Sequence, residues 1–381
     1  MNPKKLSISA TAVLFAALLS AGVLWGAEQT RSFNVTPGET LEMSVRGGIV
    51  LNPWTRSEVV VRATGIDDED LPALQMVQTG PAVRVDFRLR GEGSKDAQFE
   101  VSLPAQFNIN LRTSGGNIEI RDAMAGDLRG ATSGGSIRLT DVSGKVDMKT
   151  SGGNIHSGNI QGDTVFRTSG GSIELGMVGG TADVHTSGGN ISVANVGKTL
   201  NAKTAGGNIS VGDVGGQATV ATAGGNLTVG TVSGSADLKT AGGNIALRGG
   251  SGTITAKTAG GGIDIKNVSG SVDAKTAGGN VEAELIPSGS GTSRLETAGG
   301  DVKLFLPEGS RASIDARIRI QGNWESRSKK YEIRSDFPHQ ALQKDQDAEE
   351  IRAEFLLNGG GERISLQTVN GNIEIRKMRS K

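Results

Sequence analysis

Apolar and polar residues alternate with a period of two through the centre of the chain, in short runs that each end at a threonine. Before Thr276, the apolar Val272 and Ala274 alternate with Asp273 and Lys275, and similar runs precede many of the other threonines. Successive side chains of a β-strand point to opposite faces. The alternation therefore predicts strands with one buried face and one face in water.

A second alternating run follows each threonine after two glycines. In the unit that begins at Thr204, the apolar positions are Ile209 and Val211, and Val214 adds a third three residues further on. The residues equivalent to Ile209 are Ile118, Ile137, Ile155, Ile173, Ile191, Leu227, Ile245, Ile263 and Val281. We expect each apolar position to form a column that stacks from unit to unit.

The tetrapeptide Thr-Ser/Ala-Gly-Gly sets a strict period. It begins at Thr113, Thr132, Thr150, Thr168, Thr186, Thr204, Thr222, Thr240, Thr258, Thr276 and Thr297. From Thr132 to Thr276 it recurs every 18 residues without a slip, and the flanking intervals are 19 and 21 residues. Two glycines per unit would cost about 1 kcal/mol each in a helix. The period therefore predicts an all-β, single-domain parallel β-helix, or β-solenoid, with 18-residue rungs.

The glycines predict the corners of each rung. Gly-Gly is expected to supply one corner with positive φ, because glycine adopts that conformation without steric cost. A second corner is expected at Gly144, Gly162, Gly180, Gly216, Gly234, Gly252 and Gly270. A polar column follows Gly-Gly at Asn117, Ser136, Asn154, Ser172, Asn190, Asn208, Asn226, Asn244, Asn280 and Asp301. Stacked Asn side chains form hydrogen-bonded ladders and Asn tolerates left-handed corners, so we interpret this column as structural.

The ends of the chain differ from the repeat, and we divide the chain into four segments. A solenoid leaves open strand edges at both ends, so β-rich caps are expected there. The segments are a signal peptide or anchor at 1–27, an N-terminal cap at 28–110, the repeat array at 111–305 and a C-terminal cap at 306–381. Within the last segment, the charged residues 340–355 predict a loop or a short outer helix. The repeat returns at Thr368, which predicts a final rung that closes the rod.

The first residues have the pattern of an export signal. Lys4 and Lys5 precede an apolar run from Leu6 to Trp25, which is typical of a signal peptide. Cleavage near Gly26 is the favoured interpretation, and an uncleaved membrane anchor is the alternative, because about 20 apolar residues can span a bilayer. Val23 occupies the position that a lipidated cysteine would need, so lipidation is excluded. We expect an exported protein, periplasmic, on the cell surface or secreted, with membrane contact only if the anchor is retained.

Composition narrows the function classes. The 58 glycines recur at fixed positions among β-branched residues, which favours a repeat fold over disorder. The 40 basic and 40 acidic side chains balance, whereas a nucleic-acid-binding protein usually carries a basic excess. No nucleic-acid partner and no small-molecule cofactor are expected. The chain has no cysteine, which excludes disulfides, thiolate metal sites and cysteine nucleophiles.

One outward column is a candidate binding surface. It consists of Lys149, Arg167, His185, Lys203, Lys239, Lys257 and Lys275, and we call it the basic column. Carboxylates two residues earlier favour a solvated face of mixed charge, and the alternative is a cationic stripe for an acidic polysaccharide or an anionic surface. No catalytic, cofactor or metal residues are predicted, because no phosphate loop, calcium repeat or charge relay is visible.

The repeat and its flanks resemble the bacterial putative-adhesin family of unknown biochemical function. The resemblance rests on Thr-Ser/Ala-Gly-Gly-Asn-Ile, on Phe33-Asn34-Val35 with Pro37-Gly38, on Ser335-Asp336-Phe337-Pro338, and on the run from Leu366 to Ile373. It covers residues 31 to 377 and implies a β-helical fold and an adhesin-like role, with no catalytic residues.

Three functions are compatible with the sequence. The first is a non-enzymatic adhesin or cell-envelope scaffold that binds a protein or glycan of the envelope through its outer faces. The second is a polysaccharide-active β-helix enzyme with carboxylates such as Asp147 and Asp183, although regular rungs leave little room for a cleft. The third is an envelope-stress regulatory module that acts through its caps.

Overall fold

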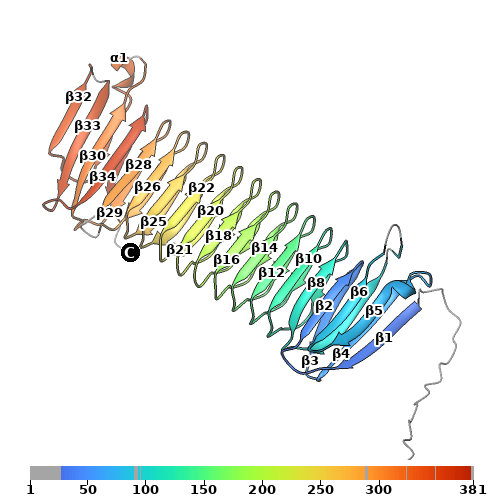
Figure 1. Cartoon of the computed structure of the whole chain (residues 1–381). Helices are drawn as coiled ribbons and strands as arrows, with labels where there is room; N and C mark the ends of the chain where they lie inside the picture. Colours follow the sequence, from blue (N-terminus) through green and yellow to red (C-terminus); the bar gives the residue numbers. More distant parts are fainter. Residues whose placement is uncertain are drawn as a thin grey trace, which may run out of the picture.

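The protein is a rod of stacked coils (Figure 1). The computed structural model describes residues 27–89, 93–94, 96–287, 291–322, 324–347 and 349–378. The predicted signal peptide or anchor thus lies outside the described residues, apart from Ala27. Two long and mainly parallel sheets enclose one continuous apolar core. The prediction of an all-β solenoid is therefore confirmed.

Each 18-residue rung contributes one strand to each sheet. Sheet A has 17 strands in the described residues, in the spatial order β1 (Ala27–Asn34), β4 (Glu58–Ile66), β7 (Gln98–Pro104), β3 (Gly48–Trp54), β9 (Ile118–Ile120), β11 (Ile137–Leu139), β13 (Ile155–Ser157), β15 (Ile173–Leu175), β17 (Ile191–Val193), β19 (Ile209–Val211), β21 (Leu227–Val232), β23 (Ile245–Gly250), β25 (Ile263–Val268), β27 (Val281–Leu285), β29 (Val302–Leu306), β35 (Ile373–Lys377) and β31 (Ile333–Ser335).

Sheet B contains the strands that end at the repeat threonines or one residue before them. Its order in the described chain is β5 (Leu74–Thr79), β6 (Ala82–Phe87), β2 (Thr40–Val45), β8 (Asn108–Thr113), β10 (Leu128–Thr132), β12 (Val146–Thr150), β14 (Thr164–Arg167), β16 (Ala182–His185), β18 (Leu200–Lys203), β20 (Ala218–Ala221), β22 (Ala236–Lys239), β24 (Ile254–Lys257), β26 (Val272–Thr276), β28 (Thr292–Thr297), β34 (Glu362–Val369), β30 (Ala312–Arg319), β33 (Glu350–Leu357) and β32 (Ala341–Asp345). The short helices η1 (Leu71–Ala73) and α1 (Trp324–Arg327) lie outside both sheets.

The predicted apolar columns are buried and stack in register. Ile191, Ile209 and Leu227 are paired partners on consecutive strands of sheet A, and each is at most 1% exposed. The third apolar position forms a column of single parallel bridges that runs from Met124 to Val232. The core is thus continuous along the rod, with each rung covering the apolar side chains of the next.

The threonine that opens each tetrapeptide holds consecutive rungs together. In one rung, the Thr222 hydroxyl donates a hydrogen bond of 2.9 Å to the carbonyl of Gly207, which belongs to the preceding rung. The same oxygen accepts the backbone N–H of Gly225, at 3.3 Å. Thr222 is 7% exposed, so both partners would be costly to leave unsatisfied. The threonines therefore act as buried polar links between rungs.

The Asn column forms the predicted ladder, but by a different route. The Oδ1 atom of Asn208 accepts the backbone N–H of Asn226, one rung on, at 2.8 Å, and Asn226 does the same for Asn244. The ladder therefore runs from side chain to backbone rather than between side chains. None of the column members described has positive φ, so the left-handed geometry expected of these Asn residues is wrong.

The prediction that the repeat glycines need positive φ is also wrong. Positive φ occurs at Gly38, Gly47, Gly65, Gly80, Gly291, Gly322, Gly359 and Gly360, and at no described glycine of the repeat corners. The second glycine of each pair is required for a different reason. A Cβ atom on Gly207 would lie 2.1 Å from the carbonyl oxygen of Gly189 in the preceding rung. Glycine is needed there because two backbones stack in direct contact.

The N-terminal end departs from the order of the sequence. The rung made by β2 and β3 lies between two others. One is made by β6 and β7, and the other is made by β8 and β9. Beyond the rung of β6 and β7, β4 pairs antiparallel with β7, β1 pairs antiparallel with β4, and β5 pairs antiparallel with β6. Antiparallel strands thus close this end of the parallel stack.

Antiparallel strands also close the C-terminal end, and its structure corrects two expectations. The rung that contains Thr368 stacks in register on β28 and β29, as predicted, but it is not the outermost rung, because β30 and β31 pair with its other side. Residues 340–355, for which a loop or an outer helix was expected, instead supply β32 and most of β33. These two strands extend sheet B in antiparallel pairing.

Candidate functional site

The basic column lies on the outer face of sheet B. Its members occupy equivalent positions on β12, β14, β16, β18, β22, β24 and β26, and the pairing register places each beside the next. Ala221 interrupts the column on β20. The register therefore brings the seven predicted residues onto one face with one position missing.

Carboxylates neutralise most of the column. Lys149 is 3.3 Å from Asp147, and Lys239 is 2.7 Å from Asp237. Lys257 pairs across the rungs with Asp273 at 3.0 Å. These pairs are half exposed and are individually worth little, about 0–1 kcal/mol. They nevertheless favour a face of mixed charge over a continuous cationic stripe.

A polar cluster around Asp183 interrupts the regular pattern. The Asp183 carboxylate accepts from Arg167 at 2.6 Å, and its other oxygen lies 2.7 Å from His185 Nε2. Asn201 donates to the same carboxylate at 2.7 Å and lies 3.1 Å from His185. Three contacts thus face the Asp183 carboxylate, and a fourth joins Asn201 to His185 in the same surface patch, so Asp183 is held by its neighbours.

Asp147 and Asp183, the carboxylates named for an enzymatic role, both lie on the outer face of sheet B. They stand at equivalent positions on β12 and β16, with Val165 of β14 between them. Two strand spacings amount to about 9.6 Å, and each carboxylate is engaged by a cation. Within the described residues, no group of three or more His, Asp and Glu side chains is arranged to hold a metal ion.

A groove at the N-terminal end of sheet B was missed by the sequence analysis. It consists of three adjoining hollows of about 990, 280 and 650 Å³, and Arg112 lines all three. The cations along the groove are Arg46, Arg84, Arg88, Arg112, Arg129 and Lys149. We call it the Arg112 groove. Its signal was present in the sequence, because Arg112 precedes Thr113 as Lys149 precedes Thr150.

The acidic side chains of the groove are already occupied. Arg84 binds Glu42 at 2.7 Å, and this hydrogen bond raises the pKa of Arg84. Arg88 pairs with Asp86 at 3.2 Å and also donates to Ser44. Among the described residues, Arg112 has no hydrogen-bond or ion-pair partner for its guanidinium. The groove therefore contains one cation that is free to bind a ligand.

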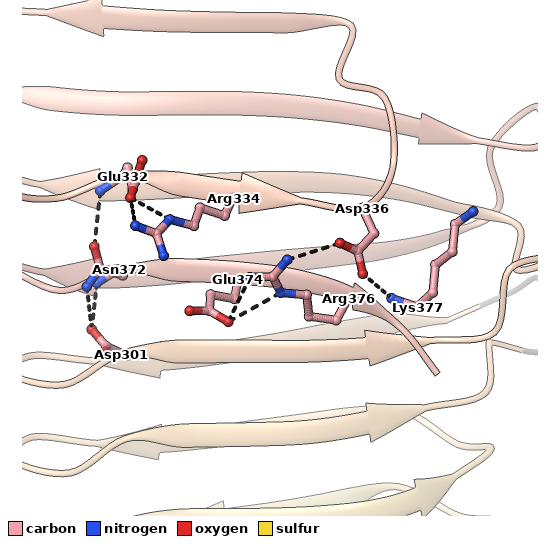
Figure 2. A network of polar contacts seen from close by, with 8 residues as sticks. All are labelled: Asp301, Glu332, Arg334, Asp336, Asn372, Glu374, Arg376 and Lys377. Carbon is pink, nitrogen blue, oxygen red and sulfur yellow. Dashed lines mark hydrogen bonds and ion pairs between the residues drawn. The ribbon is translucent and has the colours of Figure 1, made fainter. Parts of the chain in front are cut away.

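A second polar network joins the last two rungs to the C-terminal cap (Figure 2). Asp336 accepts from the guanidinium of Arg376 at 3.0 Å and from the backbone N–H of Lys377 at 3.1 Å. The backbone bond from Lys377 and then the Arg376 bond lower the pKa of Asp336 below its usual range. Asn372 continues the ladder, because its N–H binds Asp301 and its Oδ1 accepts the N–H of Glu332. This network is structural and fixes β31 against β35.

The described part of the chain has no helix of the length and apolar character needed to cross a bilayer. Fold and surface together define an adhesin-like β-solenoid with two long outer faces. The chain matches the profile of the family described as Toastrack DUF4097 twice, over residues 26–211 and 180–376, and it belongs to that family. The resemblance predicted from the repeat is thereby confirmed.

Solved structures show similar chains at low identity. A protein described as a putative adhesin from Bacteroides fragilis is 17% identical, covers 68% of this chain and 97% of its own, and has a TM-score of 0.30. Two proteins from Parabacteroides distasonis each cover 93% of this chain and 98% of their own. One is described as a putative adhesin, with 10% identity and a TM-score of 0.26, and the other as a putative lipid binding protein, with 12% and 0.21. These values carry no argument about function. A comparison with curated proteins yields no significant match.

Proposed function

We propose that the protein is an exported, non-enzymatic binding scaffold that holds a protein or glycan of the cell envelope against the outer face of sheet B. The supporting observation is the register of that face from β8 to β28. Each strand presents two outward side chains at equivalent positions, one strand spacing of about 4.8 Å from the next. Such a surface suits an extended partner better than a compact substrate.

The arrangement of the carboxylates supports a role without catalysis. A general acid or base needs a carboxyl group that can exchange a proton with a substrate. Asp147 and Asp183 are instead held by the cations beside them. Export is supported by Lys4 and Lys5 before the apolar run of the first 25 residues, and it places the face where envelope polymers are available.

The test is a pull-down from envelope extract with three forms of the protein. The first variant replaces Lys239, Lys257 and Lys275 by Gln. Its matched control replaces Arg138, Arg248 and Lys303 of sheet A by Gln, which removes the same charge from the other face. We expect partner capture to be lost in the first variant and retained in the second. Equal capture by both variants would contradict the proposal.

A deletion of residues 187–222 separates face from caps. It removes two rungs in register, so the flanking rungs can stack on each other. We expect the shortened rod to fold and to bind an extended partner more weakly. Full capture by the shortened rod would assign binding to the caps and overturn the proposal, as would the release of reducing or unsaturated ends from uronate polymers by the protein.

A further inference from the structure

The Arg112 guanidinium stands between two small neighbours. The pairing register places Ser44 of β2 on one side of it and Ala131 of β10 on the other. Neither side chain is long enough to cover an arginine. Arg112 therefore projects from the floor of the groove with a hollow on each side, the smaller of about 280 Å³ and the larger of about 650 Å³.

The charge around Arg112 is positive. The two hollows are lined by the cations Arg84, Arg88, Arg112, Arg129 and Lys149 and by the carboxylates Glu42, Asp86 and Asp147. Five cations against three carboxylates leave an excess of two positive charges. Arg129 approaches Asp147 only to 3.9 Å, and its side chain is 74% exposed. The cations of the two hollows therefore repel one another more than the described carboxylates offset. An anion bound at Arg112 would reduce this repulsion.

We infer that the Arg112 groove binds the carboxylate groups of an acidic glycan. A guanidinium pairs with a carboxylate through two parallel hydrogen bonds, which gives both strength and orientation. Ser44 and Asn110 line the hollows beside Arg112, Ser114 lines the third hollow of the groove, and all three can bond to sugar hydroxyls. The groove crosses five adjacent strands from β6 to β12, about 19 Å, so it accommodates a chain of sugar units rather than a single one.

The lining favours a glycan over a membrane surface. Among the larger apolar residues that line the groove, Met43, Val45, Phe87 and Leu111 are at most 5% exposed and only Leu89 is partly exposed, so the groove offers little anchorage for lipid. Membrane-binding surfaces combine basic residues with exposed apolar side chains. The groove therefore suits a glycan better than a membrane surface.

The inference rests on the proposed function and is tested separately from it. The probe is a short oligogalacturonate, with a neutral oligosaccharide of the same length as the comparison, and binding is measured by calorimetry at low and at raised salt. We expect the acidic probe alone to bind, with an affinity that falls as salt rises. The variant Arg112→Gln should weaken binding by about ten-fold or more, because hydrogen bonds to charged groups are among the strongest polar contacts.

Arg248→Gln is the matched control. It removes one exposed guanidinium from β23 of sheet A, outside the groove and the basic column and far along the rod. We expect it to leave oligogalacturonate affinity within about two-fold of the wild type. Arg112 is exposed and has no partner to lose, so Arg112→Gln should melt like the wild type.

The remaining outcomes overturn the inference. These are the absence of oligogalacturonate binding, equal loss in both variants, and binding to phosphatidylglycerol vesicles in preference to oligogalacturonate. If envelope extract still yields a partner that depends on Lys239, Lys257 and Lys275 in such a case, only the assignment of the groove falls. If partner capture instead fails while oligogalacturonate still binds, the assignment of the groove stands and the basic column loses its proposed binding role.

Discussion

The hydroxyl of Thr150 donates a hydrogen bond of 2.7 Å to the backbone carbonyl of Gly135, one rung earlier in the rod. The same contact recurs with each following threonine of the array, for example from Thr240 to Gly225 at 2.8 Å. Thr150 also accepts the N–H of Gly153 in its own rung. One buried hydroxyl per rung thus satisfies a donor and an acceptor of the glycine corners, where regular strand pairing has ended.

Removal of this hydroxyl should destabilise the rod. Thr222→Val keeps the shape of the side chain but leaves the Gly207 carbonyl and the Gly225 N–H without their partner. We expect a loss of about 1–3 kcal/mol in the free energy of unfolding, measured by chemical denaturation. Thr219→Val is the control, on the outer face of β20, which ends just before Thr222, and it should change stability by less than about 0.5 kcal/mol. Equal effects of the two substitutions would contradict a buried link.

The Asn ladder has a gap that can be filled. Gly262 stands in the Asn column and offers no side-chain acceptor to Asn280 in the next rung, whereas its own N–H binds Asn244 at 2.7 Å. Its φ is not positive, and a Cβ there would lie 3.3 Å from the nearest atom, the carbonyl oxygen of Asn280, which must shift by a few tenths of an ångström to admit it. Gly262→Asn should therefore stabilise the protein by about 0.5–1.5 kcal/mol in thermal or denaturant unfolding.

The reverse change provides the control for this prediction. Asn226→Ala removes an acceptor that binds the N–H of Asn244 at 2.8 Å. It should cost about 1 kcal/mol. A neutral result for Asn226→Ala would show that the ladder does not contribute to stability, and a gain at Gly262 would then need another cause.

The network in Figure 2 predicts a pH dependence. The hydrogen bonds from Lys377 and Arg376 lower the pKa of Asp336 in the folded protein. A carboxyl group whose pKa is lower in the folded protein stabilises the fold at a pH above its unfolded pKa, about 3.9. This contribution is lost as the pH falls through the pKa of the folded protein. Asp336→Asn should therefore melt below the wild type at pH 7, and the difference should close below about pH 3.9.

A second carboxylate serves as the comparison for Asp336. Glu282 lies on the same sheet, and no ion pair or side-chain hydrogen bond involves it in the described structure. Glu282→Gln should follow the wild-type melting temperature across the whole pH series. A constant difference between Asp336→Asn and the wild type at every pH would mean that the carboxylate charge does not stabilise this end.

Residue type and spacing predicted the interior of the rod. Ile209 and Val211 alternate with polar residues, and the 18-residue period puts each beside its equivalent in the next rung. These features depend only on the period of a strand and on stacking, so they can be derived from the sequence. The direction of the Asn ladder could not be, because residue type does not say whether Asn208 faces a side chain or a backbone N–H.

The ends were less predictable for a physical reason. The rung of β2 and β3 lies out of sequence order, and pairing between distant segments is not encoded in any local pattern. The strand β33 did carry a signal, since Ile351, Ala353 and Phe355 alternate with charged residues. Its neighbour β32 is the edge of sheet B and is largely exposed. Their charged residues suggested a loop although the backbone is extended.

The candidate site shows the same division. The register of the basic column could be predicted from the period, and Arg112 belongs to the same series of positions. Its lack of a partner depends on Ser44, which comes from a rung that the chain inserts out of order. Only the three-dimensional arrangement shows that small side chains flank this arginine.

Direct stacking of one rung's backbone on the next holds the repeat together and leaves the outer faces for function. The two glycines of one corner test this stacking in a single measurement. The denaturant midpoint of Gly206→Ala is compared with the midpoint of Gly207→Ala. A Cβ on Gly206 would lie 3.4 Å from the nearest atom, whereas on Gly207 it would lie 2.1 Å from the Gly189 carbonyl oxygen. We predict a change within about 1 kcal/mol for Gly206→Ala and a loss of about 3 kcal/mol or more for Gly207→Ala. Equal midpoints for the two variants would contradict the stacking.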